Sequence, residues 1–477
     1  MDNIKIGIDF GTTNTSVAYM KYNNISSIFS PECFELDNGV IMRSAITYMD
    51  DNNFWIGDDA LRNSYKYPNQ YIDSLKRQVV NDTLKHKCFG SKVESDILAD
   101  FFSSVMDRIK LQIPYGCVVD GVAIGVPIGF RDRDKELYIQ SLIKSGIYED
   151  YGTASRNTMF VSEPIAAVLN YNVSLRDDKR VLVFDFGGGT LDLVIMDMNN
   201  IRRSNEISMH DVISKKGKLN LGGNDFDRAI LEDIVVEKYG MTNLKKSLGI
   251  NQLIDILKVQ EGIALMNEIR RAKEELSKYE FTTIAFEKGN LKMNLEVTRE
   301  EYEYAINSYL KTIENLVDEC LSYAGLTPND IDIVVLSGGS SLTPAVQKLL
   351  FDIFGVHKVK IDPGNTMTCI SRGLALRAHD PGANRYNDIL EHSYGVIMKD
   401  KQGNNTIIRK VLERGMKIKD INDKDYYREF VLIKEAKDKN IFIVKICEDS
   451  EEIGKARIKL TDEMFNSKFK MYFTIDE

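Results

Sequence analysis

Two segments far apart in the chain share one pattern of apolar and polar residues. Residues 5–20 and residues 181–196 each begin with a short apolar run, continue with Asp-Phe-Gly and a turn rich in glycine and threonine, and end with a second apolar run. Apolar runs on both sides of such a turn are typical of a β-hairpin. The repeat therefore predicts two β-hairpins with the same chemistry at their tips, one in each of two structurally related lobes.

Strands and helices alternate between and after the two hairpins. A strand is expected at 121–127, where an apolar run ends at Pro127, and a helix at 162–171, with Pro164 in its first turn. The other expected elements are a helix at 131–145, a charged amphipathic stretch of one or more helices at 251–279, a strand at 331–336, a glycine-rich turn at 337–341 and a helix at 343–354. This alternation predicts an α/β fold with a partly parallel sheet.

The pattern changes after the loop-forming residues 380–384. Short β-type runs follow, separated in part by turn-forming segments at 401–405 and 437–440. We therefore expect two domains, residues 1–382 and residues 383–477, the second small, mostly β and without a long helical region. The β-type runs lie at 394–398, 406–408, 430–433, 441–446, 456–460 and 469–474.

Composition narrows the functional classes. The 477 residues include 71 acidic and 62 basic side chains, a net charge of −9, which argues against nucleic acid or an anionic membrane as the main partner. No apolar run reaches the ~18 residues of a membrane-spanning helix, and the N-terminus lacks the basic and apolar regions of a signal peptide. Six scattered cysteines without a C-x-x-C pair predict free thiols in the cytoplasm rather than disulfides or a zinc site.

The predicted hairpin tips carry groups that suit a nucleotide phosphate. Backbone N–H groups in tight glycine-rich turns point donors at phosphate oxygens, and glycine leaves room for a close approach. Threonine hydroxyls add donors, and aspartates can hold a hydrated Mg²⁺. Either turn alone is a weak signal, but two copies and the third turn at 337–341 together predict a phosphate bound in a cleft between the lobes.

Several sequence blocks follow one another along the chain: IGIDFGTTNTSVAY (6–19), SLKR (74–77), VSEPIAAVLNY (161–171), VFDFGGGTLDLVIM (183–196), LNLGGNDFD (219–227), AKEELS (272–277) and VVLSGGSSLTPAVQKLL (334–350). In sequence and in order, these blocks resemble the heat-shock 70 chaperones of the actin/hexokinase/Hsp70 superfamily. A weaker similarity at 388–396 and 412–418 looks like the start and a later part of the family's substrate-binding β-sandwich.

The resemblance implies a fold, cofactors and site residues. The fold is a two-lobed actin-like ATPase domain with duplicated βαβ lobes, followed by a short β-rich domain without a helical lid, and the cofactors are ATP or ADP with Mg²⁺. Asp9 and Asp185 match the residues that hold Mg²⁺ through water. The implied catalytic residues are Lys76, Glu163, Asp185, Thr190 and Asp192. The implied nucleotide-binding residues are Gly11, Thr12, Thr13, Asn14, Gly187, Gly188, Gly189, Thr190, Gly222, Gly223, Lys273, Ser277, Gly338, Gly339 and Ser340.

The sequence departs from the family pattern at several positions. Leu342 stands where an arginine against the adenine is usual, and Gly364 where an aspartate is usual. Lys135 replaces an arginine in the region that couples the lobes, and lysine lacks the planar bidentate fork of arginine. These departures put adenine recognition and the coupling between domains in question, while the phosphate and Mg²⁺ residues are all present.

The resemblance implies an ATP-hydrolysing chaperone that binds unfolded polypeptides under nucleotide control. Its expected partners are client polypeptides and co-chaperones, and it is expected to be a cytoplasmic monomer or weak oligomer. Three alternatives stay open: an actin-like assembly ATPase, which polymerises with ATP; a small-molecule kinase, which phosphorylates an acceptor; and a nucleotide-switched adaptor, which hydrolyses little ATP. The blocks at 162–171 and 221–227 argue against the first alternative.

Overall fold

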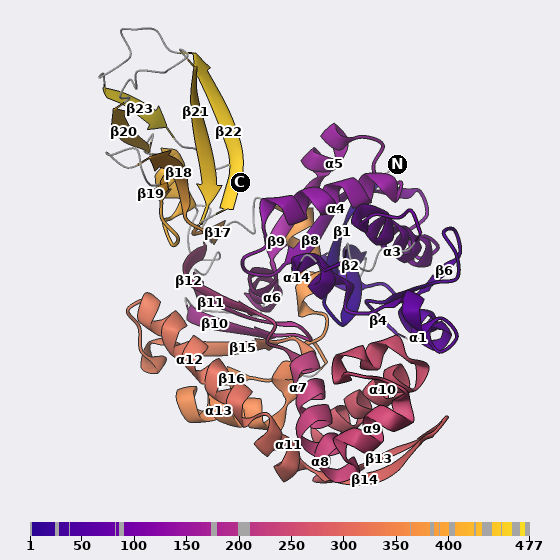
Figure 1. The fold of residues 1–477 in the computed structure, drawn as a ribbon. Helices are drawn as coiled ribbons and strands as arrows, with labels where there is room; N and C mark the ends of the chain where they lie inside the picture. The colour runs from indigo at the N-terminus through magenta and orange to yellow at the C-terminus, as the bar shows by residue number, and fades with distance from the viewer. Residues whose placement is uncertain are drawn as a thin grey trace.

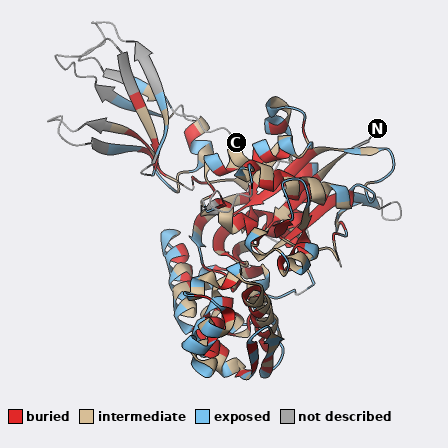
Figure 2. Cartoon of the chain, turned by 45° about the vertical axis from the view of Figure 1, so that its right-hand side comes forward, coloured by how far each residue is buried: buried red, intermediate tan, exposed pale blue. Residues whose placement is uncertain are grey.

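A computed structural model of the chain shows two α/β lobes side by side, with a β-rich unit projecting from one of them (Figure 1). Buried residues concentrate in the sheets of the two lobes and in the helices between them (Figure 2). The structure describes residues 2–23, 28–37, 39–81, 83–84, 90–172, 179–198, 210–362, 364–381, 386–390, 392–399, 406–423, 426–431, 441–449, 451–459 and 468–472.

The first lobe is built on a sheet of strand order β3-β2-β1-β8-β9, with β4 paired to β2. β1 is antiparallel to β2 and parallel to β8, and β8 is parallel to β9. Phe10, at the end of β1, is fully buried against Phe101, Phe102 and Tyr138 and so anchors the hairpin in the core. The strands are β1 (Asp2–Phe10), β2 (Asn14–Asn23), β3 (Ile28–Cys33), β4 (Met42–Arg43), β8 (Cys117–Val126) and β9 (Thr158–Ser162).

Helices and a small second sheet complete the first lobe. The three rings that meet Phe10 come from α3 (Glu94–Ile109) and α4 (Asp132–Lys144). The small sheet has the order β6-β5-β7. Its elements and their neighbours are β5 (Ile46–Tyr48), β6 (Phe54–Ile56), β7 (Tyr71–Ile72), α1 (Gly57–Ser64), the 3₁₀-helix η1 (Pro68–Gln70), α2 (Leu75–Val80) and α5 (Tyr151–Asn157).

The second lobe contains a sheet of order β16-β15-β10-β11-β12-β17. β10 is antiparallel to β11 and parallel to β15, and β15 is parallel to β16. Read from the side of β17, the order β12-β11-β10-β15-β16 and the sense of these strands repeat the first sheet. Phe186 occupies the place of Phe10 and packs against Phe226. The strands are β10 (Lys179–Phe186), β11 (Thr190–Met198), β12 (His210–Leu219), β15 (Ile333–Ser337), β16 (Val359–Lys360) and β17 (Tyr386–Asn387).

A helical region and one hairpin complete the second lobe. The hairpin of β13 (Phe281–Lys288) and β14 (Leu291–Thr298) packs against α10 (Gln260–Leu276). The other elements are α7 (Gly223–Ala229), the π-helix η4 (Ile230–Val235), α8 (Val236–Tyr239), α9 (Met241–Leu248), the 3₁₀-helices η5 (Leu253–Lys258), η6 (Pro328–Asp330) and η7 (Gly339–Leu342), and α11 (Arg299–Ala305), α12 (Asn307–Tyr323) and α13 (Pro344–Phe354).

Two helices join the lobes. α14 (Cys369–His379) packs on β1 and β2, α6 (Glu163–Asn172) packs on β10 and β11, and the two helices pack on each other. They cross so closely that a Cβ at Gly373 would overlap the carbonyl of Ala166. The apolar cluster around them includes Ala123 of the first sheet and Val181 of the second, so one continuous core fixes the lobes relative to each other on this side.

The β-rich unit follows β17. Its larger sheet has the order β19-β18-β21-β22, and β20 pairs with β23. Two small buried clusters, one around Val411 and one around Leu390, form its core. Its elements are β18 (Tyr394–Lys399), β19 (Thr406–Leu412), α15 (Ile418–Asp423), β20 (Tyr427–Val431), β21 (Ile441–Glu448), β22 (Glu451–Lys459) and β23 (Lys468–Tyr472).

Within the described residues, the elements predicted from the sequence are present, and the expected strand ends at 432–433, 460 and 473–474 lie outside those residues. Both repeated segments are hairpins, and α4, α6, β8, β15 and α13 lie where they were expected. The stretch 251–279 contains the short η5 and the longer α10, so it is two helices rather than one. The boundary between residues 382 and 383 and the turns at 401–405 and 437–440 lie outside the described residues.

Two expectations from composition can be compared with the structure. Among the helices described, none combines the length and the apolar character that crossing a membrane requires. Cys33, Cys117, Cys320, Cys369 and Cys447 are free thiols, as predicted, and Cys88 lies outside the described residues.

Candidate active site

The two hairpins close their tips with the same hydrogen bond. The Gly11 N–H donates to the Asn14 carbonyl (2.9 Å), and the Gly187 N–H donates to the Thr190 carbonyl (3.1 Å). The phenylalanine before each glycine is buried in the core, so the aspartate before it faces the opposite side of its strand. This alternation places both aspartates in the cleft between the lobes.

The tips approach each other so closely that glycine is required. A Cβ at Gly188 would overlap Oγ1 of Thr13, and a Cβ at Gly189 would lie 2.7 Å from Oγ1 of Thr12. A Cβ at Gly222 would overlap the backbone of 188–189. Gly188, Gly189 and Gly222 are needed for their small size rather than for an unusual backbone conformation, because none of them has a positive φ. The threonine hydroxyls and the glycine backbone therefore face one narrow space.

This space is part of a cavity between the lobes. It encloses about 600 Å³, including the open solvent at its mouth, a volume within the range of small-molecule sites. Most of the predicted phosphate, Mg²⁺ and catalytic residues line it together. The lining residues are Asp9, Gly11, Thr12, Thr13, Asn14, Thr15, Ser16, Ile41, Lys76, Glu163, Asp185, Gly187, Gly188, Thr190, Gly338, Gly339, Thr366, Met367 and Ile370.

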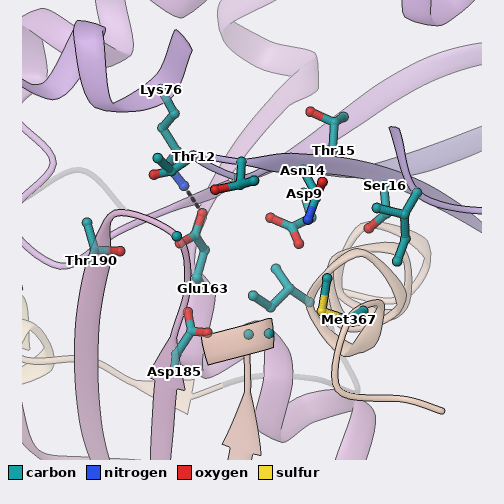
Figure 3. Close-up of a pocket in the computed structure, with 18 of the residues that line it drawn as sticks. Asp9, Thr12, Asn14, Thr15, Ser16, Lys76, Glu163, Asp185, Thr190 and Met367 are labelled. Carbon is teal, nitrogen blue, oxygen red and sulfur yellow. Dashed lines mark hydrogen bonds and ion pairs between the residues drawn. The ribbon is translucent and has the colours of Figure 1, made fainter. Parts of the chain in front are cut away.

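Four acidic side chains and one lysine meet at the cavity. Lys76, the second residue of α2, forms an ion pair with Glu163, the first residue of α6, and both are at least 95% buried. Asp185 and Asp192 are a directly opposed pair on β10 and β11, and both are buried. Figure 3 shows the Lys76 side chain reaching toward Glu163, with Asp185 below the pair and Asp9 beside it. The group carries an excess of negative charge.

Burial shifts the pKa values in this group toward neutrality. Withdrawal from water raises the pKa of Asp9 to about 7, opposed by the charge of Lys76 and reinforced by Asp185. It raises the pKa of Asp185 to about 6, opposed by a hydrogen bond with Ser337 and by Lys76. It also lowers the pKa of Lys76 to about 8, although Asp9, Asp192 and Asp185 favour the charged lysine. A bound cation would relieve this desolvation of the carboxylates.

The acidic group fits a divalent cation. One carboxylate oxygen from each of Glu163, Asp185 and Asp192 lies within 4.8 Å of the others. Oxygen ligands of this kind suit Mg²⁺, which usually keeps several of its waters. Asp9, the other predicted Mg²⁺ residue, lies outside that cluster but close enough to Asp185 for the two charges to interact. The donor set therefore suits a hydrated Mg²⁺ beside Asp185.

The third glycine-rich turn supports the second hairpin tip. Gly338 has φ of +77°, and a Cβ there would overlap the carbonyl of Phe186. The Ser340 hydroxyl donates to the Gly187 carbonyl (2.8 Å). Gly339 lies against Met367, where a Cβ would be 3.0 Å from the sulfur. The turn between β15 and α13 thus holds the tip and also lines the cavity.

Some predicted nucleotide-binding residues support the cavity without lining it. Lys273 forms an ion pair with the buried Asp227 (2.7 Å) and donates to the Gly223 carbonyl (2.7 Å), and the Ser277 hydroxyl donates to the carbonyl of Lys273. A Cβ at Gly223 would lie 2.5 Å from the Ser340 hydroxyl. The predicted residues outside the lining are Gly189, Asp192, Gly222, Gly223, Lys273, Ser277 and Ser340.

The departures from the family pattern lie away from the charged group. Leu342 ends η7, half-buried, and is not among the lining residues. Gly364 is exposed, and a Cβ there would lie 3.6 Å from a carboxylate oxygen of Asp362. Lys135 forms an exposed ion pair with Asp132 on α4 (3.1 Å).

Several lining residues were missed by the sequence analysis. Thr15 and Ser16 continue β2 from the tip, and both are buried polar residues within an otherwise apolar run, which is a usable signal. Ile41, Met367 and Ile370 are apolar residues in no recognisable motif. They reach the cavity only because the fold brings β4 and the start of α14 to it.

Comparison with known proteins gives two findings. The family described as Hsp70 protein matches residues 152–392, just over half of the chain. The chaperone protein DnaK of Elusimicrobium minutum (strain Pei191) is 30% identical over 384 residues. This match covers 78% of the present chain and 57% of the relative, so the chain spans less than two thirds of that protein's length.

The raised pKa of Asp9 gives a stability test. Asp9 has a pKa of about 7 in the folded protein against 3.8 for an unperturbed aspartate. Its contribution to folding is therefore complete below about pH 4 and is lost as the pH rises through 7. We predict that D9N gains stability relative to the parent from pH 5 to pH 8, by about 1 kcal/mol or more.

The measurement is urea unfolding at pH 5, 6, 7 and 8 in EDTA without nucleotide. D107N, at an exposed position, serves as the control and should differ from the parent by the same amount at every pH. An equal difference between D9N and the parent at pH 5 and pH 8 would contradict the assignment.

Proposed function

The chain belongs to the Hsp70 protein family, and we propose that it binds ATP with Mg²⁺ and hydrolyses the ATP to ADP and phosphate. The observation that carries this proposal is the meeting of two glycine-threonine tips above a buried lysine and four carboxylates. The tips offer donors for phosphate oxygens, and the charged group offers ligands for the cation that accompanies them.

The phosphates are proposed to lie between the two tips. The N–H groups of Gly11 and Gly187 donate to carbonyls within their own turns. The residues between each donor and its acceptor, 12–13 and 188–189, therefore face the ligand. The hydroxyls of Thr12 and Thr13 and the N–H groups of Gly188 and Gly189 would donate to phosphate oxygens. When bound, Mg²⁺, held through water by Asp9 and Asp185, would neutralise charge on these oxygens.

Lys76 is proposed as the main residue for the attack of water on the γ-phosphate. Its ammonium group would offset charge that develops on the phosphate and hold the water in line. Two carboxylates would accept hydrogen bonds from that water. Glu163 is ion-paired with Lys76, and the charge of Asp192 acts on Lys76. Thr190, on the same side of the cavity, would orient the water. The water oxygen forms a bond to the γ-phosphorus as the bond from the β-γ bridging oxygen to that phosphorus breaks and ADP leaves. The proton that the water loses passes to one of the two carboxylates that accept its hydrogen bonds.

We further propose the domain division 1–382 and 383–477, with two duplicated lobes in the first domain. The matching order and sense of the two main sheets support the duplication. The β-rich unit is proposed to be a relative of a substrate-binding β-sandwich that binds unfolded polypeptides, with co-chaperones as further partners. The free cysteines are consistent with a cytoplasmic location, and a monomer or weak oligomer is expected.

Contacts between the second lobe and the β-rich unit support nucleotide control of that binding. β17 adds to the edge of β12, and the buried Lys215 of β12 forms an ion pair with Asp388 (2.7 Å). The Tyr323 hydroxyl donates to the carbonyl of Arg414 (2.9 Å), and Arg414 donates to the carbonyl of Lys215 (3.3 Å). A change in the second lobe would therefore alter the anchorage of the β-rich unit.

We predict that K76M lowers the single-turnover rate of ATP hydrolysis by about 10²-fold or more, because it removes the charge aimed at the γ-phosphate. Affinity for ADP should change far less, since the tips remain intact. Quench-flow with radiolabelled ATP and calorimetry with ADP measure the two quantities. K311M, at an exposed position on α12, is the control. A K76M rate within threefold of the parent would contradict the assigned role.

The chaperone role predicts that peptide affinity depends on the bound nucleotide. A fluorescent unfolded peptide should bind the full chain with Kd values that differ by at least about fivefold between ATP and ADP. D388N, which weakens the ion pair with Lys215, should reduce this difference while hydrolysis continues, and D233N, at an exposed position, should not. Equal Kd values in a parent protein that hydrolyses ATP would favour an assembly ATPase or an adaptor instead.

A further inference from the structure

Asn224 links the two lobes beside the cavity, although it is not one of the lining residues. It is the second residue of α7, directly after the glycine pair that confines the second hairpin tip. Its backbone N–H donates to the Gly188 carbonyl (2.9 Å), so the residue is fixed to that tip. It lies within the block 219–227, but the sequence analysis gave it no role.

The side chain of Asn224 contacts both lobes. Its amide nitrogen donates to Oγ of Ser74 (3.0 Å) in the first lobe. Its amide oxygen accepts from Arg270 (3.4 Å) in the second lobe and, at 3.5 Å, from the hydroxyl of Thr13 at the first hairpin tip. Because a guanidinium group can only donate, Arg270 fixes the amide oxygen and leaves the amide N–H₂ for Ser74.

Ser74 is held in an unusual backbone conformation at the start of α2. Its φ and ψ are +52° and +43°, in the left-handed region that a residue with a side chain rarely adopts. Ser74 is the N-cap of α2, yet its side chain makes no capping hydrogen bond to that helix. The hydroxyl accepts from Asn224 instead, so a residue of the second lobe stabilises the start of this helix in the first lobe.

Lys76 follows Ser74 by two residues, so the conformation of Ser74 sets where Lys76 leaves the backbone. The contact between α2 and the second lobe continues at the next residue, where Arg77 pairs with Asp225 (2.9 Å) and also bonds to Asn220 (3.1 Å). Both links cross the cleft, and movement of the lobes apart would break them. The position of Lys76 is thereby tied to the position of the second hairpin tip.

We propose that Asn224 is a positioning residue that places Lys76 for hydrolysis when the lobes are closed. The inference rests on the proposed ATPase function and adds to it a link between lobe closure and the hydrolytic step. Asn224 acts through Ser74 and contributes little to nucleotide affinity, because its side chain does not line the cavity. Its contact with the Thr13 hydroxyl, at 3.5 Å, is the longest of the three side-chain hydrogen bonds named above, so that hydroxyl can donate to a phosphate instead. Its loss should therefore lower the hydrolysis rate more than the affinity.

The test compares N224A with the parent in two backgrounds. In the native background, N224A should lower the single-turnover rate of ATP hydrolysis about tenfold or more, with the Kd for ADP changed less than threefold. S74G removes both the hydroxyl and the backbone strain, because glycine accepts the left-handed conformation. In the S74G background, N224A should therefore lower the rate by less than threefold. N243A, at an exposed amide on α9, should leave rate and affinity unchanged.

Hydrogen exchange provides a readout that does not depend on hydrolysis. The Gln78 N–H donates to the Ser74 carbonyl (3.1 Å), so its exchange reports the first turn of α2. N224A should speed exchange in a peptide covering 74–81 at least fivefold in the native background and little in the S74G background. Equal losses of rate and affinity, equal effects of N224A in both backgrounds, or unchanged exchange at 74–81 would overturn the proposal. A parent protein that does not hydrolyse ATP would overturn the proposed function, while the exchange experiment still decides the link between Asn224 and α2.

Discussion

The close approach of two hairpin tips across the cleft is the constraint on which the rest of the structure depends. Gly188 and Gly189 leave no space for a side chain against Thr12 and Thr13, so small changes in the relative position of the lobes would disrupt the site. The core between α6 and α14 fixes that position, and its helices cross at Gly373 with the same lack of space. Glycine at these positions is explained by packing between segments that are distant in sequence, because the local backbone does not require it.

The electrostatics of the cavity follow from this geometry. The hairpins bring a half-buried Asp9 and a buried Asp185 to one cavity, and α2 and α6 add Lys76 and Glu163. Carboxylates so placed resist ionisation, which is why the pKa values of both aspartates rise toward neutrality. A site of this kind is complete only when a cation and an anionic ligand share it, and a nucleotide with Mg²⁺ supplies both. Gathering these charged side chains in the cavity costs free energy of folding, and the same arrangement provides the proposed site for Mg²⁺ and a nucleotide.

Much of the fold and the site could be predicted from local pattern. The repeat identified both hairpins because strand, tip and strand are contiguous, and Pro164 marked the first turn of α6. The residues that depend on long-range packing could not be found in this way. Met367 lines the cavity from the segment just before α14, and the proposed role of Asn224 depends on its hydrogen bond to Ser74 of the other lobe. The common order of the two sheets was likewise beyond a pattern search, since β15 joins β10 from more than 140 residues away and β16 then joins β15.

The most direct measurement of the central claim is a crystal structure of the full chain with ADP and Mn²⁺, the metal located by its anomalous scattering. The account predicts the phosphates between Thr12–Thr13 and Gly187–Gly189, within hydrogen-bond distance of both tips, and the metal beside Asp185 and Asp9. A nucleotide bound away from the tips, or a metal held outside the acidic group, would contradict it.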